Sequence, residues 1–372
     1  MKVLAVLHTP RSPHSAVYIV YEQLKRHLRA RGHTLAILTP NDFPRLRRLH
    51  PRWLPLVYPL VVDRWLQRRR STFDLVSFHS YAGWRANLRR RRILKSITAF
   101  HGLEPLHYEE LFAEMKRLGR PLKLRFRALH GWLLPRLIRL SCRRSDRVLC
   151  LNQTEAAYLR QHRWADPASV VVFSHGVSEE FFIDRTFAPE VSTLCFVGQW
   201  LERKGIGDLV EAFRTIAADH PALRLCCVGT LADPDHVRAS FPAEVRSRVD
   251  VHPRVDHHEL AGLYARADVF VLPTLFEGFS LALLEAMAAR LPIVTTPVGA
   301  APDLLENGQN AVLVPVRDPR ALASALAQLL EDAALRERLG RAAQSKARNF
   351  TLERVNEHLL LVLTQVLAFP AA

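Results

Sequence analysis

The stretch Val269–Met287, VFVLPTLFEGFSLALLEAM, decides the fold. Its first four residues form an apolar run of strand length, Pro273 and Gly278 mark a turn, and a helix is expected from about Ser280. A short buried strand that leads through a turn into a helix is typical of open α/β sheets, where ligands bind outside the carboxyl ends of the strands. The stretch therefore predicts a parallel sheet with a ligand site in this turn.

Two carboxylates lie in this stretch, Glu277 in the turn and Glu285 inside the helix. The first amides of a helix lack intrahelical acceptors, so those from Phe279 to Ala282 can receive a phosphate, and Gly278 allows close approach of the backbone. Glu285 can accept hydrogen bonds from vicinal hydroxyls such as a ribose diol. This arrangement suits a nucleotide sugar. On spacing alone, an ordinary strand, turn and helix with two solvated glutamates is the alternative.

The segment that begins at Glu277, EGFSLALLEAMAARLPIVTTPVGAAPDLLENGQNAVLVP, resembles the signature of retaining glycosyltransferases of family 4, which have the GT-B fold. Matching elements continue through most of the chain, most specifically from Phe196 to about Leu330. The resemblance implies an α/β protein of two Rossmann-like doubly wound domains that face each other across a cleft. It implies transfer of a sugar from a UDP- or GDP-type donor in the second domain to a glycan or lipid-linked acceptor in the first, in cell-surface polysaccharide or glycolipid synthesis.

The resemblance also implies roles for single residues. Glu285 would bind ribose hydroxyls, Glu277 a hydroxyl of the donor sugar, and Lys204, in the turn GQWLERKG, the leaving diphosphate. His101, in FHGLEP, would approach the transferred sugar from the acceptor side. The implied catalytic residues are His101, Lys204 and Glu277. The implied donor-binding residues are Gln199, Lys204, Arg254, Val255, Glu277, Gly278, Phe279, Ser280, Leu281 and Glu285.

Several features depart from the family pattern, among them Ser280 and Ala282, which replace the more usual glycine and proline. Gln199 stands where arginine is common and brings no positive charge. Arg203, next to Lys204 in the same turn, is a candidate to supply the missing charge. His175 replaces the usual asparagine in SHGV. The first turn, HTPRSPHS, has no glycine. Its candidate phosphate contacts are His8, Arg11 and Ser15.

Hydrophobic periodicity predicts the elements around these motifs. Two predicted strands in the first half each lead to a histidine, one to His79 and the other to His101. Read alone, a histidine in this position is more often structural than functional. Of the two, only the loop FHGLEP, which contains His101, resembles a loop of the family. The apolar patch Leu54–Leu66 is either a basic surface helix at lipid head groups or part of the domain core. Strands in the second half are predicted at Thr193–Val197, Leu223–Val228, His252–Val255, Val269–Leu272, Ile293–Thr296 and Ala311–Val314.

A length of 372 residues suits two domains. We expect an acceptor-side domain over 1–183, a linker over 184–191, a donor domain over 192–350 and, as in related proteins, a final segment 351–372 whose helix packs back toward the first domain. The five cysteines show no CxxC spacing and are interpreted as reduced core residues. The resemblance implies neither a cofactor nor a bound metal, because lysine and helix amides take the place of a metal ion in such enzymes. The one Asp-x-Asp string, Asp233-Pro234-Asp235, is interpreted as a helix cap rather than a pair of metal ligands.

The formal charge of +16 lies in the first half: residues 1–190 hold 34 Lys and Arg against 15 Asp and Glu, and the rest 18 against 21. Such a surface attracts nucleic acid or an anionic membrane, and a solvated arginine-rich face is the alternative. No zinc-finger, RNA-recognition or helix-turn-helix signature is present, so no specific nucleic acid is expected. No apolar run spans a bilayer and the amino-terminal stretch is interrupted before it could be a signal peptide. We expect a cytoplasmic protein, with attachment to the inner membrane face as an alternative.

Three alternatives to sugar transfer remain. The same fold could serve a nucleotide-sugar epimerase or a phosphorylase. A degenerate homologue could bind a nucleotide without turnover, which Gln199 and the glycine-free first turn favour. A non-enzymatic nucleic-acid-binding protein rests only on the sequence pI of about 10.3.

Overall fold

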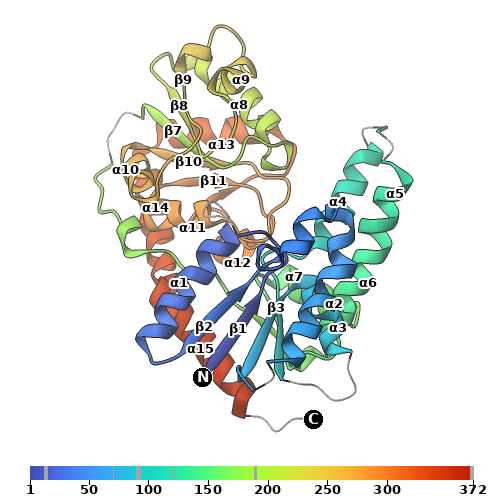
Figure 1. Cartoon of the computed structure of the whole chain (residues 1–372). Helices are drawn as coiled ribbons and strands as arrows, with labels where there is room; N and C mark the ends of the chain where they lie inside the picture. Colours follow the sequence, from blue (N-terminus) through green and yellow to red (C-terminus); the bar gives the residue numbers. More distant parts are fainter. Residues whose placement is uncertain are drawn as a thin grey trace. The chain divides into compact units, whose positions relative to one another are not determined.

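The computed structural model describes residues 1–11, 16–69, 71–88, 94–117, 119–120, 122–187 and 191–368 (Figure 1). They form two compact units: unit 1 is Met1–His175 with Val355–Ala372, and unit 2 is Gly176–Arg354. Each unit contains a six-stranded sheet in which every strand pair is parallel. The predicted fold class, α/β with two Rossmann-like doubly wound domains, is confirmed.

Unit 1 has the strand order β2-β1-β3-β4-β5-β6. Its strands are β1 (Lys2–Val6), β2 (Thr34–Leu38), β3 (Leu75–His79), β4 (Lys95–Ala99), β5 (Arg147–Cys150) and β6 (Val170–Val172). Its helices are α1 (Ala16–Ala30), α2 (Leu54–Gln67), α3 (Trp84–Asn87), α4 (Glu104–Arg117), α5 (Leu124–Arg127), α6 (Leu134–Cys142), α7 (Gln153–Gln161) and, from Val355 on, α15 (Leu352–Ala368).

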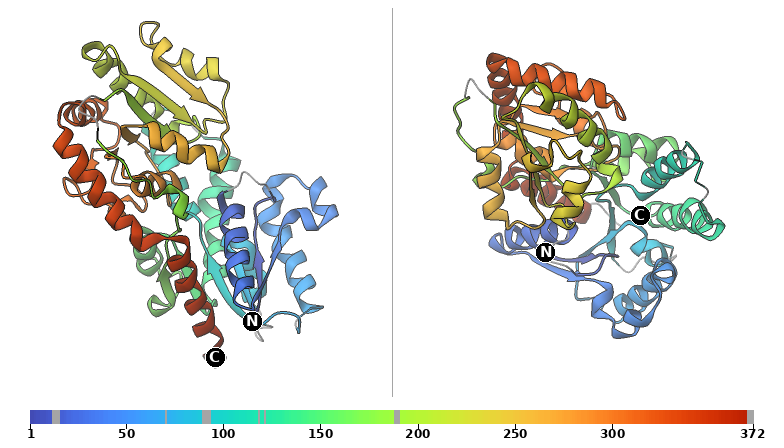
Figure 2. Two further views of the ribbon diagram at one scale, coloured as in Figure 1. Left: turned by 90° about the vertical axis from the view of Figure 1, so that its left-hand side faces the viewer. Right: turned by 90° about the horizontal axis from the view of Figure 1, so that it is seen from above.

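The sheet of unit 1 is covered on both faces. Alternate residues of a strand point to opposite faces, so Leu4 packs with Tyr58 of α2 on one side. Val3, on the other side, lies with Leu24 of α1 and Leu363 of α15 around a cavity of about 30 Å³. Figures 1 and 2 accordingly show α15 running along the face that α1 covers. Because both faces are buried, the strands are mostly apolar, and the polar residues inside them, such as Ser77 and Thr98, are themselves buried.

The apolar patch Leu54–Leu66 forms α2, and the structure supports core packing for it. Tyr58, Val62 and Leu66 are at most 2% exposed and join the core cluster of β1 and β3. Leu60 is 40% exposed, on the outer side of the helix. In the described ranges no helix is both long and apolar enough to cross a membrane.

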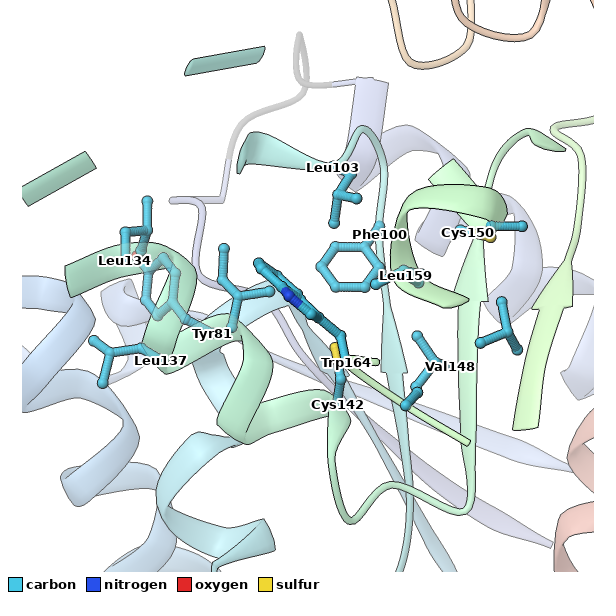
Figure 3. Close-up of a cluster of buried hydrophobic side chains, with 14 residues drawn as sticks. Tyr81, Phe100, Leu103, Leu134, Leu137, Cys142, Val148, Cys150, Leu159 and Trp164 are labelled. Carbon is cyan, nitrogen blue, oxygen red and sulfur yellow. The ribbon is translucent and has the colours of Figure 1, made fainter. Parts of the chain in front are cut away.

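A second core cluster joins the later strands of the sheet to α6 and α7 (Figure 3). Phe100 and Val148 come from the sheet side, Leu137 from α6 and Leu159 from α7. Helices α5 and α6 are joined by a π-helical segment, Ala128–Leu133. All five cysteines of the chain are buried and unbridged, as the sequence predicts.

Unit 2 has the strand order β12-β11-β10-β7-β8-β9. Its strands are β7 (Thr193–Val197), β8 (Arg224–Val228), β9 (Val249–His252), β10 (Val269–Leu272), β11 (Ile293–Thr295) and β12 (Val312–Leu313). Its helices are α8 (Ile206–Asp219), α9 (Pro234–Ala239), α10 (His257–Arg266), α11 (Leu281–Ala288), α12 (Ala301–Leu304), α13 (Pro319–Glu331) and α14 (Ala333–Ala347).

One predicted strand is wrong. His252–Val255 was expected to be extended, but β9 is Val249–His252, whose residues pair with Leu225 to Val228 of β8. Pro253 follows directly, and because proline has no amide hydrogen it cannot continue the ladder. Arg254 and Val255 therefore lie in the loop after β9. The cap at Asp233 is confirmed, since its side chain accepts hydrogen bonds from the first amides of α9.

In each sheet there is one point at which the order of adding strands reverses, so that later strands are added on the other side of the first one. It lies between β1 and β3 in unit 1 and between β7 and β10 in unit 2. In open parallel sheets, ligands bind outside the carboxyl ends of the strands at this switch point, because the two connecting helices leave on opposite sides there. The residues that follow these four strands are therefore the first to consider for a site.

A glycine holds the two turns at the switch point of unit 2 together. Gly205 ends the turn after β7 with a left-handed backbone, φ 70°. A Cβ atom added to it would lie 1.8 Å from the carbonyl oxygen of Pro273, in the turn after β10. Both the backbone conformation and the short distance exclude a side chain at this position.

We predict that Gly205→Ala lowers the free energy of unfolding by about 3 kcal/mol or more, because strain of the left-handed backbone adds to a backbone clash. Gly207→Ala, two residues later, is the matched control: nothing lies within 4 Å of its added Cβ. In a helix this control should be neutral or stabilise by up to about 1 kcal/mol. Urea unfolding followed by circular dichroism measures both, and equal stability of the two variants would contradict the prediction.

Candidate functional site

The turns after β7 and β10 are joined at the switch point of unit 2. The amide of Leu275 donates a hydrogen bond to the carbonyl oxygen of Arg203 at 2.8 Å. The hydroxyl of Thr274 donates to the same oxygen at 3.0 Å. Together with the contact at Gly205, these bonds fix the turn Gly198–Gly205 against the turn that begins at Pro273. Side chains from both turns therefore face one small region.

Two cations converge on one carboxylate in this region. The ammonium group of Lys204 donates a hydrogen bond to Oε2 of Glu277, and the guanidinium of Arg203 lies 3.6 Å from the same oxygen. Lys204 is 8% exposed and the Glu277 side chain 15%, so this pair is largely withdrawn from water. Two positive charges against one negative leave a local excess of positive charge, which suits an anionic ligand.

The start of α11 lies next to Glu277. Ser280 caps the helix by accepting a hydrogen bond from the amide of Leu283 at 3.2 Å. The amides of Leu281 and Ala282, at the first two positions, lie at the helix end where an α-helix offers no intrahelical acceptor. Behind them Gly299 packs so closely that an added Cβ would lie 2.1 Å from the carbonyl oxygen of Glu277.

Glu285 lies one turn into α11 and accepts a hydrogen bond from the hydroxyl of Tyr264 at 3.0 Å. Burial raises the pKa of Glu285 to about 7, although the bond from Tyr264 opposes the shift. The single proton of the same hydroxyl is shared with the carbonyl oxygen of Ala282, 3.2 Å away, and so Tyr264 ties α10 to the start of α11. A carboxylate that the fold does not stabilise is a candidate for ligand binding.

The remaining predicted donor-binding residues lie along the same carboxyl edge of the sheet. Gln199 is the second residue after β7 and is exposed. Arg254 and Val255 follow β9, the edge strand, which β8 separates from β7. Gly278 and Phe279 lie between Glu277 and the cap of α11. The structure thus joins Lys204, Glu277 and the start of α11, while Arg254 and Val255 lie two strands away.

Four histidines form a column at the carboxyl edge of unit 1. His8 follows β1, His79 ends β3, His101 follows β4 and His175 follows β6. The rings of His8 and His79 stack with centroids 4.3 Å apart. His101 packs edge-on against His79 at 5.1 Å, stacks on His175, and its Nδ1 lies 3.3 Å from Nε2 of His175. Tyr21 of α1 packs edge-on against His101.

Burial keeps these four imidazoles neutral near pH 7. It lowers the pKa of His8 and of His175 to about 4, and the pKa values of His79 and His101 well below the usual value. Within the described ranges no three His, Cys, Asp or Glu side chains are grouped to hold a metal ion. The column is therefore a neutral, polar surface at the place where the strands end.

Two of the candidate phosphate contacts of the first turn, Arg11 and His8, already interact with other residues of unit 1. Arg11 makes an ion pair with Asp42 at 3.3 Å, and its amide donates to Asn41. His8 is neutral and stacked on His79. Ser15 lies outside the described residues. Neither Arg11 nor His8 has the unshared positive charge that a phosphate contact needs.

Sequence reasoning missed two features of these sites. Tyr264 carried no signal of its own, because an apolar residue on the inner face of a helix is expected to be core. The histidines were considered one at a time. Their common feature, a position just after a strand, could have indicated that they meet, since the carboxyl ends of parallel strands share one edge of the sheet.

We predict a pH-dependent effect of Glu285→Gln on stability. With a folded-state pKa of about 7, the wild-type fold holds a proton that the unfolded chain releases above about pH 4.5, so this group costs increasing stability from pH 4.5 to 7. The variant has no such ionisable group, so its free energy of unfolding should rise relative to that of the wild type between pH 5 and pH 8, by up to about 3 kcal/mol. Urea unfolding at several pH values measures the difference. The exposed Glu331→Gln is the control, and a difference for Glu285→Gln that is constant with pH would contradict the prediction.

Comparison with known proteins identifies the family of this chain. Residues 191–332 match the family model described as glycosyl transferases group 1, and residues 18–181 match the model described as glycosyltransferase family 4. The chain is similar to D-inositol 3-phosphate glycosyltransferase of Salinispora tropica, with 31% identity over 249 residues, 60% of this chain and 52% of the relative. It spans about half the length of the curated relatives that it matches.

Solved structures of similar fold cover the whole chain. Sucrose-phosphate synthase from Thermosynechococcus elongatus superposes with a TM-score of 0.78 at 22% identity, over 99% of this chain and 100% of the other. The Anabaena protein HepE, solved in complex with UDP, superposes with a TM-score of 0.72 at 16% identity, over 98% and 100%. With both halves matched by family models, the chain belongs to the group 1 and family 4 glycosyltransferases and has the GT-B fold.

Proposed function

We propose that this protein is a retaining glycosyltransferase that binds a nucleotide-sugar donor at the switch point of unit 2. The observation that carries the proposal is the convergence of Lys204, Arg203 and Glu277 at the start of α11, between two strands whose order makes them the ligand-binding position of the sheet. Family membership supports sugar transfer as the reaction.

The diphosphate of the donor would lie between Lys204 and the amides of Leu281 and Ala282. Its arrival would separate Lys204 from Glu277, because a diphosphate offers more negative charge to the ammonium group than a single carboxylate does. Glu277 would then accept a hydrogen bond from a hydroxyl of the donor sugar. Arg203 already lies 3.6 Å from Glu277 and supplies the second charge that Gln199 does not.

Glu285 would bind the two ribose hydroxyls of the nucleotide. It lies one turn beyond the proposed phosphate position, on the same helix, and Tyr264 holds its carboxylate with one hydrogen bond. Accepting hydrogen bonds from a diol stabilises the ionised form, so binding would recover part of the stability that burial of the carboxylate costs. Arg254 and Val255, after the edge strand, would lie toward the nucleobase.

The transfer itself needs charge stabilisation more than a nucleophile on the protein. The bond between the anomeric carbon and the diphosphate oxygen breaks, a bond from that carbon to the acceptor oxygen forms on the same face, and the acceptor proton passes to the leaving diphosphate. Lys204 and the helix amides would stabilise the diphosphate in the place of a metal ion. We assign His101 to the acceptor side, as a neutral imidazole that can donate or accept a hydrogen bond.

The UDP complex of HepE makes a uridine nucleotide the first donor to test. We predict that one of UDP, GDP, ADP and CDP raises the melting temperature of the wild-type protein. Lys204→Ala and Glu285→Ala should each raise the dissociation constant of that nucleotide about tenfold to a hundredfold, since each removes a hydrogen bond that involves a charged group. Lys346→Ala and Glu331→Ala, on the exposed surface of the same unit, should leave the shift unchanged.

The same preparation tests turnover. We predict release of the nucleotide from its sugar conjugate, with activity that persists in EDTA, and a product whose anomeric configuration, read by NMR, equals that of the donor. Binding without release would favour a degenerate homologue, and isomerised sugar without transfer would favour an epimerase. No shift with any nucleotide, in a protein that melts cooperatively, would contradict the proposed donor site.

A further inference from the structure

A pocket of about 530 Å³ lies at the switch point of unit 1. We name it the β1/β3 pocket, because His8 after β1 and Tyr81 after β3 line it together with Glu104, the first residue of α4. Its position relative to the sheet of unit 1 is the one that the donor site occupies in unit 2, outside the carboxyl ends of the two strands where the chain order reverses.

The walls of the β1/β3 pocket are aromatic and fixed. Tyr81 and Leu134 line it and also belong to the core cluster of Figure 3, so the protein interior holds them in place. Across the pocket, Tyr108 of α4 packs on His130 with ring centroids 4.2 Å apart, and Phe126 packs on His130 at 4.3 Å. Flat, rigid apolar walls suit the apolar face of a ring-shaped ligand.

The polar groups of the pocket are unevenly placed. Glu104 is the one carboxylate among the described lining residues, its side chain is 22% exposed, and its Oε1 lies 3.8 Å from Nε2 of His8. Burial raises the pKa of Glu104 to about 7. Arg52 and Arg125 also line the pocket, and both are exposed, so they lie on its open side.

These features describe the chemistry of one ligand class. A half-buried carboxylate beside a neutral imidazole can accept hydrogen bonds from hydroxyl groups, and the imidazole can also donate one to them. Two guanidinium groups at the opening are suited to a phosphate, which they can bind in bidentate fashion. An aromatic wall between them fits the carbon skeleton of a saturated ring.

We propose that the β1/β3 pocket binds a phosphorylated sugar or polyol as the acceptor of the transfer, with its hydroxyls on Glu104 and His8 and its phosphate on Arg52 and Arg125. The inference rests on the proposed function, since it assigns the pocket to the acceptor. The shared chemistry is a hydroxyl-rich ring that carries a phosphate. Such a group occurs free in solution or as the head group of a lipid, and the experiment separates the two.

The test is binding to the full chain, measured by calorimetry and by ligand-observed NMR. The probes are glucose 6-phosphate and inositol 1-phosphate, compared with glucose, which lacks the phosphate, and decyl phosphate, which lacks the hydroxyls. Sedimentation with phosphatidylcholine vesicles that carry phosphatidylinositol, against plain phosphatidylcholine, tests the lipid source. We expect one phosphorylated ring, free or lipid-linked, to bind at least tenfold more tightly than glucose or decyl phosphate.

Matched variants locate the site. Glu104→Gln and Arg125→Gln should each weaken binding of the phosphorylated ring by tenfold or more. Glu110→Gln, an exposed residue on the same helix as Glu104, and Arg127→Gln, two residues after Arg125 and outside the pocket lining, should not. An unchanged thermal shift with the nucleotide found for unit 2 would show that each variant is folded.

Two results overturn the inference. One is tighter binding of decyl phosphate than of any phosphorylated ring. The other is no binding of a phosphorylated ring up to about 10 mM, which corresponds to a binding free energy weaker than about 3 kcal/mol. Either result with intact nucleotide binding leaves the proposed donor site standing. Binding of the phosphorylated ring without nucleotide binding would instead contradict the donor site and keep the pocket.

Discussion

The contact between the α-carbon of Gly205 and the carbonyl group of Pro273 is the constraint on which the donor site depends. It brings the turns after β7 and β10 to backbone contact, and the hydrogen bonds to the carbonyl oxygen of Arg203 follow from that approach. Lys204 reaches Glu277 only because its own backbone is held against the second turn. A parallel sheet leaves a crevice at its switch point, and this glycine turns that crevice into a site of defined dimensions.

Both units place a carboxylate with a raised pKa next to the switch point of their sheet. Glu285 in unit 2 and Glu104 in unit 1 each have a pKa of about 7 because burial disfavours their charge. Such groups reduce the stability of the empty protein at neutral pH. Perturbed carboxylates are more common at functional sites than elsewhere, and the position of these two beside the switch points of their sheets adds a geometric reason to consider them.

The sequence predicts the second half well because its strands are short, apolar and separated by helices with clear periodicity. It fails at β9, where alternating polar residues hide a strand and the apolar Val255 suggests one beyond Pro253. Lys204 and Glu277 were singled out through the resemblance of their turns to family motifs, although 73 residues separate them. The bond from Tyr264 to Glu285 could not be predicted, because no local pattern encodes such a contact between two helices. The histidines carried a usable signal in their shared position after strands, but which of them touch depends on which strands become neighbours.

The π-helical segment Ala128–Leu133 has a consequence for how the first unit can change in evolution. A π-helical turn holds one residue more than an α-helical turn. Loss of a single codon in this segment would restore regular spacing and rotate Phe126 by about 100° relative to Leu134. Leu137 and Ile138 would keep their places in the core. One insertion or deletion can therefore reshape the aromatic wall of the β1/β3 pocket while the sheet behind it stays intact.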